Sequence, residues 1–126
     1  MNIRNYEEFV LSTEVYEFEN LKERLTNVNI IRLLHSAIGC STESNELLDN
    51  LKKHIFYGKE LDLVNIEEEL GDILWYIQIA LNVIDKSFEE IMEKNIDKLK
   101  ARYSKGFTEA DANNRDLEKE RKILEK

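Results

Sequence analysis

The chain has 126 residues, of which 42% are hydrophobic and 35% are charged, enough for one domain with a modest core. It contains no proline and only four glycines, and this shortage of helix breakers favours an all-α fold. The net charge of −8 argues against a nucleic-acid polymer as the main partner, because proteins that bind such polymers usually carry a basic surface. The same charge does not exclude a single nucleotide brought in together with metal ions.

The single cysteine and the most apolar stretch indicate the cellular compartment of the protein. Cys40 alone cannot form an intrachain disulfide or a multi-cysteine zinc site, which fits a reducing compartment. The first ten residues hold no long apolar run, so we expect no signal peptide. Residues 73–84 are too few to span a bilayer and include Gln78 and Asn82. We therefore expect a soluble cytoplasmic protein with no membrane partner.

The first half of the chain predicts two helices. The first covers about residues 6–25 and is charged, with a partial apolar side. The second covers about residues 28–54, where apolar side chains recur at helical spacing. Weak helix formers at 38–42 predict a bend or a looser stretch in the second helix. Residues 55–64, which include Gly58, are predicted to form a loop.

A third helix is predicted to begin at Asn65, which we expect to be its N-cap, with Glu68 completing a capping box. From Ile73 onward this helix is apolar almost all round, which indicates burial on more than one side. One small domain can hardly cover such a helix. We therefore expect a homo-oligomer, either a homodimer or a homotetramer.

A fourth helix is predicted from Ser87, with Glu90 in the capping-box position, to about Tyr103. The residues SKGF at 104–107 end it. Short loops between helices are typical of bundles, so we expect one domain that is a four-helix-type bundle. The domain is predicted to cover residues 1–126. Its core is expected at about residues 28–103, and a polar helical tail at residues 108–126.

Two pairs of acidic residues, each three positions apart, border the most apolar helical stretches. Glu43 and Glu46 share one side of the second helix, and Glu69 and Asp72 share one side of the third. If these helices run antiparallel, the four carboxylates can converge. Close carboxylates repel, so they would take up protons or hold a hard cation such as Mg²⁺ or Mn²⁺. In so acidic a chain, an ordinary solvated helix face is the alternative to a metal site.

Basic residues form a stripe on the fourth predicted helix. Lys94, Lys98 and Arg102 recur every four residues, and Asn95 lies beside them. Such a stripe could bind phosphate groups. It could equally be a solvated face with favourable charge near a helix C-terminus. Lys53 belongs to a second, weaker basic group that flanks the loop after the second helix.

Aromatic, histidine and cysteine side chains give weaker signals. Trp75 and Tyr76 follow the second acid pair and could stack on a nucleotide base, although a core or subunit contact is the commoner role. His35 and His54 are far apart in sequence and predict no histidine-based metal site. Cys40 is expected to pack rather than to act as a nucleophile.

Taken together, these residues resemble the MazG-like all-α nucleoside triphosphate pyrophosphohydrolases. That family has two acids three apart, a spacer, and then Glu and Asp three apart. Here the pattern is ESNE at 43–46, the 22 residues 47–68, and ELGD at 69–72. The stretch LKKHIFYGKELD is similar to the loop that connects the two acid pairs in the family. The stretches NIDKLKARYSKGF and FTEADANNRD are similar to its later segment and to the tail that often follows, so the resemblance covers about residues 33–116.

The resemblance implies an oligomeric helical fold, a requirement for Mg²⁺, and hydrolysis of an NTP or dNTP to the monophosphate and pyrophosphate. It also implies that Lys98 and Arg102 bind phosphate, within the motif that contains Asn95. We expect Glu46 to accept the proton of the attacking water, and the two basic residues to stabilise charge on the phosphates. The metal ligands implied by the resemblance are Glu43, Glu46, Glu69 and Asp72.

Two questions stay open at the level of sequence. Asn65 stands where some family members have a functional lysine, and Lys53 or Lys59 could take that role. The substrate could also be narrower, as in a dUTPase, a dCTP pyrophosphatase or a phosphoribosyl-ATP pyrophosphohydrolase. An alternative of a different class is a non-catalytic helical interaction protein.

Overall fold

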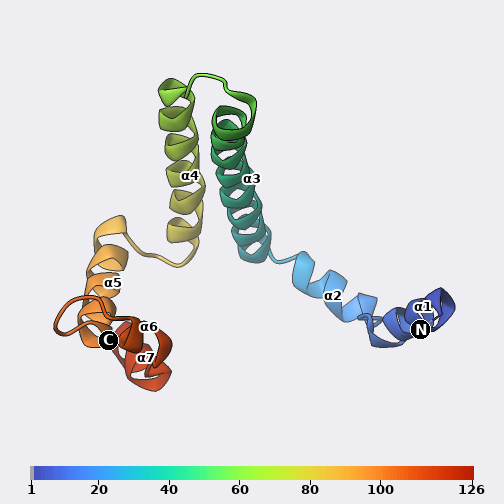
Figure 1. Ribbon diagram of the computed structural model, residues 1–126. Coiled ribbons are helices and arrows are strands. Elements are labelled where there is room, and N and C mark those ends of the chain that lie inside the picture. The colour runs from blue at the N-terminus through green and yellow to red at the C-terminus, as the bar shows by residue number, and fades with distance from the viewer. Residues whose placement is uncertain (1) are drawn as a thin grey trace.

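The structure is a computed structural model that describes residues 2–126, and it confirms the all-α prediction (Figure 1). Within these residues the only β-type pairing is an isolated bridge between Ser104 and Gly106. The seven helices of the described chain are α1 (Ile3–Thr13), α2 (Phe18–Leu25), α3 (Val28–Tyr57), α4 (Leu63–Val83), α5 (Phe88–Arg102), α6 (Glu109–Asn113) and α7 (Leu117–Leu124).

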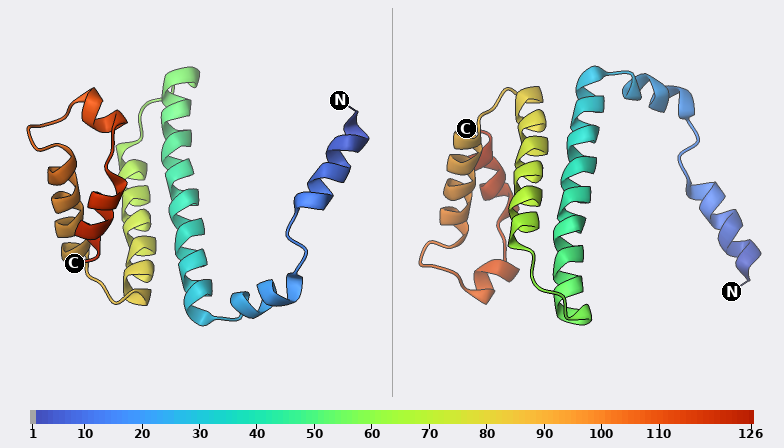
Figure 2. Two further views of the ribbon diagram at one scale, coloured as in Figure 1. Left: turned by 90° about the horizontal axis from the view of Figure 1, so that it is seen from below. Right: turned by 90° about the horizontal axis from the view of Figure 1, so that it is seen from above.

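The N-terminal region forms two helices, so the prediction of one helix over 6–25 is wrong. At the end of α1 the hydroxyl of Thr13 donates to the carbonyl of Phe9 at 2.8 Å, and Glu14 turns to extended backbone. β-Branched residues such as Thr13 and Val15 favour this departure from the helix. Figure 2 shows α1 and α2 extending away from the rest of the chain, and neither helix buries a residue.

The α3 helix continues without interruption through residues 38–42, where a bend is predicted. Gly39 is buried there against the ring of Tyr76 from α4, and a Cβ atom at this position would overlap that ring. The hydroxyl of Ser36 donates to the carbonyl of Tyr76 at 2.7 Å. The small residues in this stretch therefore allow α3 and α4 to pack closely.

The connection between α3 and α4 is shorter than predicted. Gly58 ends α3 in the left-handed region, with φ of 66°. Asp62 is the N-cap of α4, and its carboxylate accepts a hydrogen bond from the N–H of Asn65 at 3.0 Å. Asn65 is therefore not the N-cap, and its side chain is available for another contact.

The most extensive packing joins α3 and α4 in an antiparallel hairpin (Figure 1). A second pair is formed by α5 and α7, and α5 begins at the end of the hairpin opposite the α3–α4 loop. The predicted capping box at the start of α5 is confirmed, because Ser87 and Glu90 exchange both hydrogen bonds. The closed four-helix bundle stays a prediction.

A single chain buries little apolar surface. Among residues 2–126, Leu81 is the only hydrophobic residue that is buried, and many large apolar side chains are exposed. The accessible surface is 10,643 Å², whereas a compact monomer of 14.9 kDa would expose about 7,000 Å². None of the helices described here combines the length and the apolar character needed to cross a membrane.

Candidate metal centre

Three carboxylates from the α3–α4 hairpin converge. Glu43 comes from α3, and Glu69 and Asp72 come from α4. One oxygen of each lies within 4.8 Å of an oxygen of the other two. Glu69 is buried, Glu43 is half-buried and Asp72 is exposed, so an ion can reach the group from solvent. The antiparallel packing predicted from the loop brings these acids together.

Glu69 is the most buried of the three acids, and its pKa is raised. Its residue is only 7% exposed. Burial raises the pKa of its carboxyl, and the neighbouring carboxyl of Glu43 raises it further. A hydrogen bond from Asn65 acts in the opposite direction. A buried carboxylate beside another acid requires a proton or a cation to offset the repulsion.

The donor set of this group fits a hard divalent ion. All three side chains offer carboxylate oxygens, which suit Mg²⁺ or Mn²⁺, and no thiolate or imidazole takes part. It is the one group of at least three His, Cys, Asp or Glu side chains at metal-binding separation in residues 2–126. Cys40 instead directs its thiol to the carbonyl of Ile73 at 3.9 Å, in line with a packing role.

Glu46 lies one turn along α3 from Glu43 and outside the three-carboxylate group. Its side chain is exposed and lines a polar cavity of about 480 Å³ at the loop end of the hairpin. Lys53 lines the same cavity and pairs with Asp49, which raises the pKa of the lysine. Glu46 and Lys53 therefore face one cavity beside the carboxylates.

Two asparagines next to the carboxylates were missed as site residues. The amide of Asn65 donates to Oε1 of Glu69 at 2.8 Å, and the amide of Asn50 donates to Oδ1 of Asn65 at 3.0 Å. Their spacing carried a signal, since Asn65 precedes Glu69 by one helical turn and Asn50 follows Glu43 by two. The acidic motif by itself indicates only the carboxylates, because amides at helical spacing are common and carry no charge.

The basic residues of α5 lie away from the three carboxylates within one chain. Asn95 and Lys98 line a mostly apolar groove of about 520 Å³ between α5, α7 and the end of α4, together with Ile91 and Leu124. Because α5 begins at the far end of the hairpin and Glu69 lies in the first half of α4, one chain does not bring this groove to the carboxylates (Figure 1).

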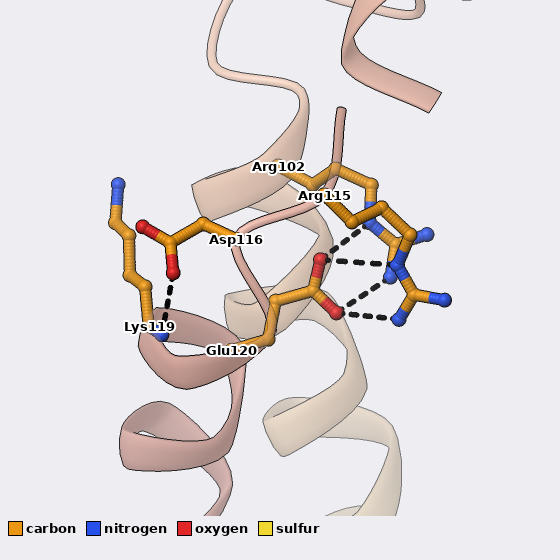
Figure 3. A network of polar contacts seen from close by, with 5 residues as sticks. All are labelled: Arg102, Arg115, Asp116, Lys119 and Glu120. Atoms are coloured by element: carbon orange, nitrogen blue, oxygen red, sulfur yellow. Dashed lines mark hydrogen bonds and ion pairs between the residues drawn. The ribbon is translucent and has the colours of Figure 1, made fainter. Parts of the chain in front are cut away.

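Arg102 is held by the C-terminal tail. Its Nε and Nη2 donate to the two carboxylate oxygens of Glu120, each at 2.7 Å, and Nη2 of Arg115 donates to Oε2 at 2.7 Å (Figure 3). Arg102 and then Arg115 lower the pKa of the buried Glu120 to about 2. The sequence gives no sign of this pair, because the two partners are 18 residues apart on different helices.

Trp75 is 58% exposed. Its ring meets that of Tyr76 edge to face, with the centroids 5.0 Å apart. Much of the side chain is therefore available to a nucleotide base or to another subunit, and both roles stay predictions.

Comparison with known proteins gives one family and one relative. The family model of the MazG nucleotide pyrophosphohydrolase domain matches residues 34–107. The chain is 26% identical over 88 residues to the Gene 37 protein of Mycobacterium phage L5, a match that covers 66% of this chain and 76% of the relative. No solved structure gives a significant match. The matched region contains Arg102 but ends before Arg115 and Glu120.

Proposed function

Since the chain belongs to the MazG nucleotide pyrophosphohydrolase family, we propose that it hydrolyses NTPs or dNTPs to the nucleoside monophosphate and pyrophosphate with the help of Mg²⁺. The observation that carries this proposal is the convergence of Glu43, Glu69 and Asp72 on the α3–α4 hairpin. A triphosphate and this chain are both strongly anionic, so a cation between them is required to offset their repulsion.

The residues that would hold the ion are the three converged acids, with Glu46 as a fourth ligand from the next turn of α3. Mn²⁺ suits the same oxygen donors. The chemistry that such an ion supplies when bound is neutralisation of phosphate charge and acidification of water. Glu46 is exposed and faces the polar cavity, which supports its proposed second role of accepting a proton from the attacking water.

We assign the phosphates to Lys98 and Arg102, with Asn95 beside them, and a weaker phosphate contact to Lys53. A guanidinium fork and an ammonium both stabilise charge that builds on phosphate oxygens. For Arg102 this role requires phosphate to replace Glu120, because the fork is already filled. Trp75 is assigned to the base because its ring is exposed and contacts the ring of Tyr76 edge to face.

A homodimer or homotetramer is part of the proposal. The chain exposes roughly half as much surface again as a compact monomer of its size, and obligate interfaces bury on the order of 2,000–5,000 Å² in total. Assembly would cover the apolar sides of α3 and α4. It is also the simplest way to bring the basic residues of α5 near carboxylates that they do not reach within one chain.

The test of this function is incubation of the full chain with a panel of NTPs, dNTPs and modified nucleotides plus Mg²⁺. The expected products are the monophosphate and pyrophosphate, and their formation should stop when EDTA is added. Release of orthophosphate alone would refute the reaction class. The same panel separates a broad enzyme from a dUTPase, a dCTP pyrophosphatase or a phosphoribosyl-ATP pyrophosphohydrolase.

The extensive exposed apolar surface also favours a second candidate, a helical interaction protein without catalysis. Thermal melts with increasing Mg²⁺ separate the two candidates. An enzyme with the proposed site gains stability as the ion occupies it, whereas an interaction protein need not respond.

A further inference from the structure

A directed chain of hydrogen bonds runs from Asn50 on α3, through Asn65 on α4, to the most buried acid of the candidate site. Nδ2 of Asn50 donates to the carbonyl of Asp62 at 2.9 Å and to Oδ1 of Asn65 at 3.0 Å. Nδ2 of Asn65 then donates to Oε1 of Glu69 at 2.8 Å. Asn50 is only 8% exposed, so water competes little for its amide. The chain thus links α3, the N-cap of α4 and Glu69.

Chemistry fixes the direction of both amides. An ionised carboxylate only accepts hydrogen bonds, so Asn65 must turn its NH₂ group toward Glu69 and leave its oxygen as an acceptor. The carbonyl of Asp62 is also an acceptor, so Asn50 must turn its own NH₂ group toward both of these oxygens. Aspartate in place of either asparagine would set two acceptors against each other.

The backbone of Asn65 is held by a hydrogen bond as well as its side chain. Its N–H donates to the N-cap carboxylate of Asp62 at 3.0 Å, while Asn50 fixes the amide oxygen. A side chain held at both ends loses little further freedom when it orients a neighbour. The single bond to Oε1 leaves other lone pairs of Glu69 available to an ion.

We propose that Asn65 and Asn50 are positioning residues of the metal centre, which hold the side chain of Glu69 in the orientation that faces Glu43 and Asp72. This inference rests on the proposed function, since it assumes that the three acids bind a divalent ion. Asn65 acts on Glu69 directly, and Asn50 acts through Asn65. Partners of this kind orient metal ligands in other proteins, and their loss typically costs about 10- to 100-fold in metal affinity.

The experiment measures the dissociation constant of Mn²⁺ by calorimetry on the full chain. Asn65→Ala is expected to raise it about 10- to 100-fold, and Asn50→Ala is expected to raise it by a smaller factor. The double variant should match Asn65→Ala alone, because the two residues act in series. The matched control is Gln78→Ala, which removes an exposed amide pair to Asn82 on the same helix and should leave the constant unchanged.

Thermal melts in EDTA separate positioning from a purely structural role. If Asn65→Ala lowers the melting temperature and leaves Mn²⁺ affinity at the wild-type value, the positioning role is overturned while the metal site stands. If the wild type binds no Mn²⁺, both the site and the positioning role fail. Should Asn65→Ala not fold, the comparison of Asn50→Ala with Gln78→Ala decides, and equal affinities contradict the proposal.

Discussion

Arg102 and Glu120 form a two-pronged ion pair that fastens α7 to α5 (Figure 3). The pair is largely shielded from solvent, and Arg115 adds a second guanidinium to the same carboxylate. The tail, predicted to be polar and helical, therefore docks on the domain by a charged contact. The same contact fills the fork that we assign to phosphate.

The first prediction concerns docking of the tail. Glu120→Gln should release α7, because a neutral amide cannot satisfy two guanidinium groups and leaves charge buried. Hydrogen exchange should then become faster in α7 while α3 and α4 keep their protection. Glu118→Gln, an exposed change on the same helix, is the matched control. Equal protection of α7 in wild type and Glu120→Gln would show that other contacts hold the tail.

The second prediction concerns acid. The pKa of Glu120 is lowered from 4.5 to about 2, so its stabilising effect is fully present above pH 4.5 and is lost as pH falls toward 2. The difference in unfolding free energy between wild type and Glu120→Gln should therefore shrink across this window. Urea unfolding at several pH values measures it. A difference that stays constant from pH 5 to 2 would contradict the role of this ion pair.

The third prediction concerns the carboxylates. Glu46→Gln and Asp72→Asn should each abolish pyrophosphate release and leave the helical circular dichroism spectrum unchanged, because both changes remove charge without altering shape. Glu93→Gln, an exposed acid on α5, should retain activity as the control. Near-normal turnover in Glu46→Gln or in Asp72→Asn would remove that residue from the proposed site.

The fourth prediction concerns phosphate binding. Lys98→Ala should lower kcat by about 10²- to 10³-fold if its ammonium stabilises charge on the phosphates in the transition state. Lys100→Ala removes an exposed lysine from the same helix and should have little effect. Steady-state kinetics with the best nucleotide of the panel measures both. Equal kinetics in the two variants would assign Lys98 to a solvated helix face.

The fifth prediction concerns helix packing. Gly39→Ala should destabilise the chain by about 1–3 kcal/mol, because the new methyl group overlaps the ring of Tyr76. Gly71→Ala is the matched control, since nothing lies within 4 Å of a Cβ atom there and alanine is the better helix former. Urea unfolding of both variants measures the difference. A Gly39→Ala chain as stable as Gly71→Ala would mean that the two helices separate readily.

Local sequence was sufficient for features that depend on neighbouring residues. The capping box of Ser87 and Glu90 could be predicted because both partners lie within one turn. The start of α4 could not be predicted in the same way. Asp62 and Asn65 are both good N-cap residues, and the choice between them involves Asn50 on another helix, which binds the side chain of Asn65.

The sequence by itself determined the helical class, the family pattern and the acids that share a helix face, because helical periodicity and acid spacing are properties of a few consecutive residues. Only the tertiary structure decided that Glu43 joins Glu69 and Asp72, that Asn65 holds Glu69, and that Arg102 pairs with Glu120. In each of these contacts, which two residues meet depends on how the helices pack and which side chains they bury. The energies of buried charges and amides are set by that packing, which no local pattern contains.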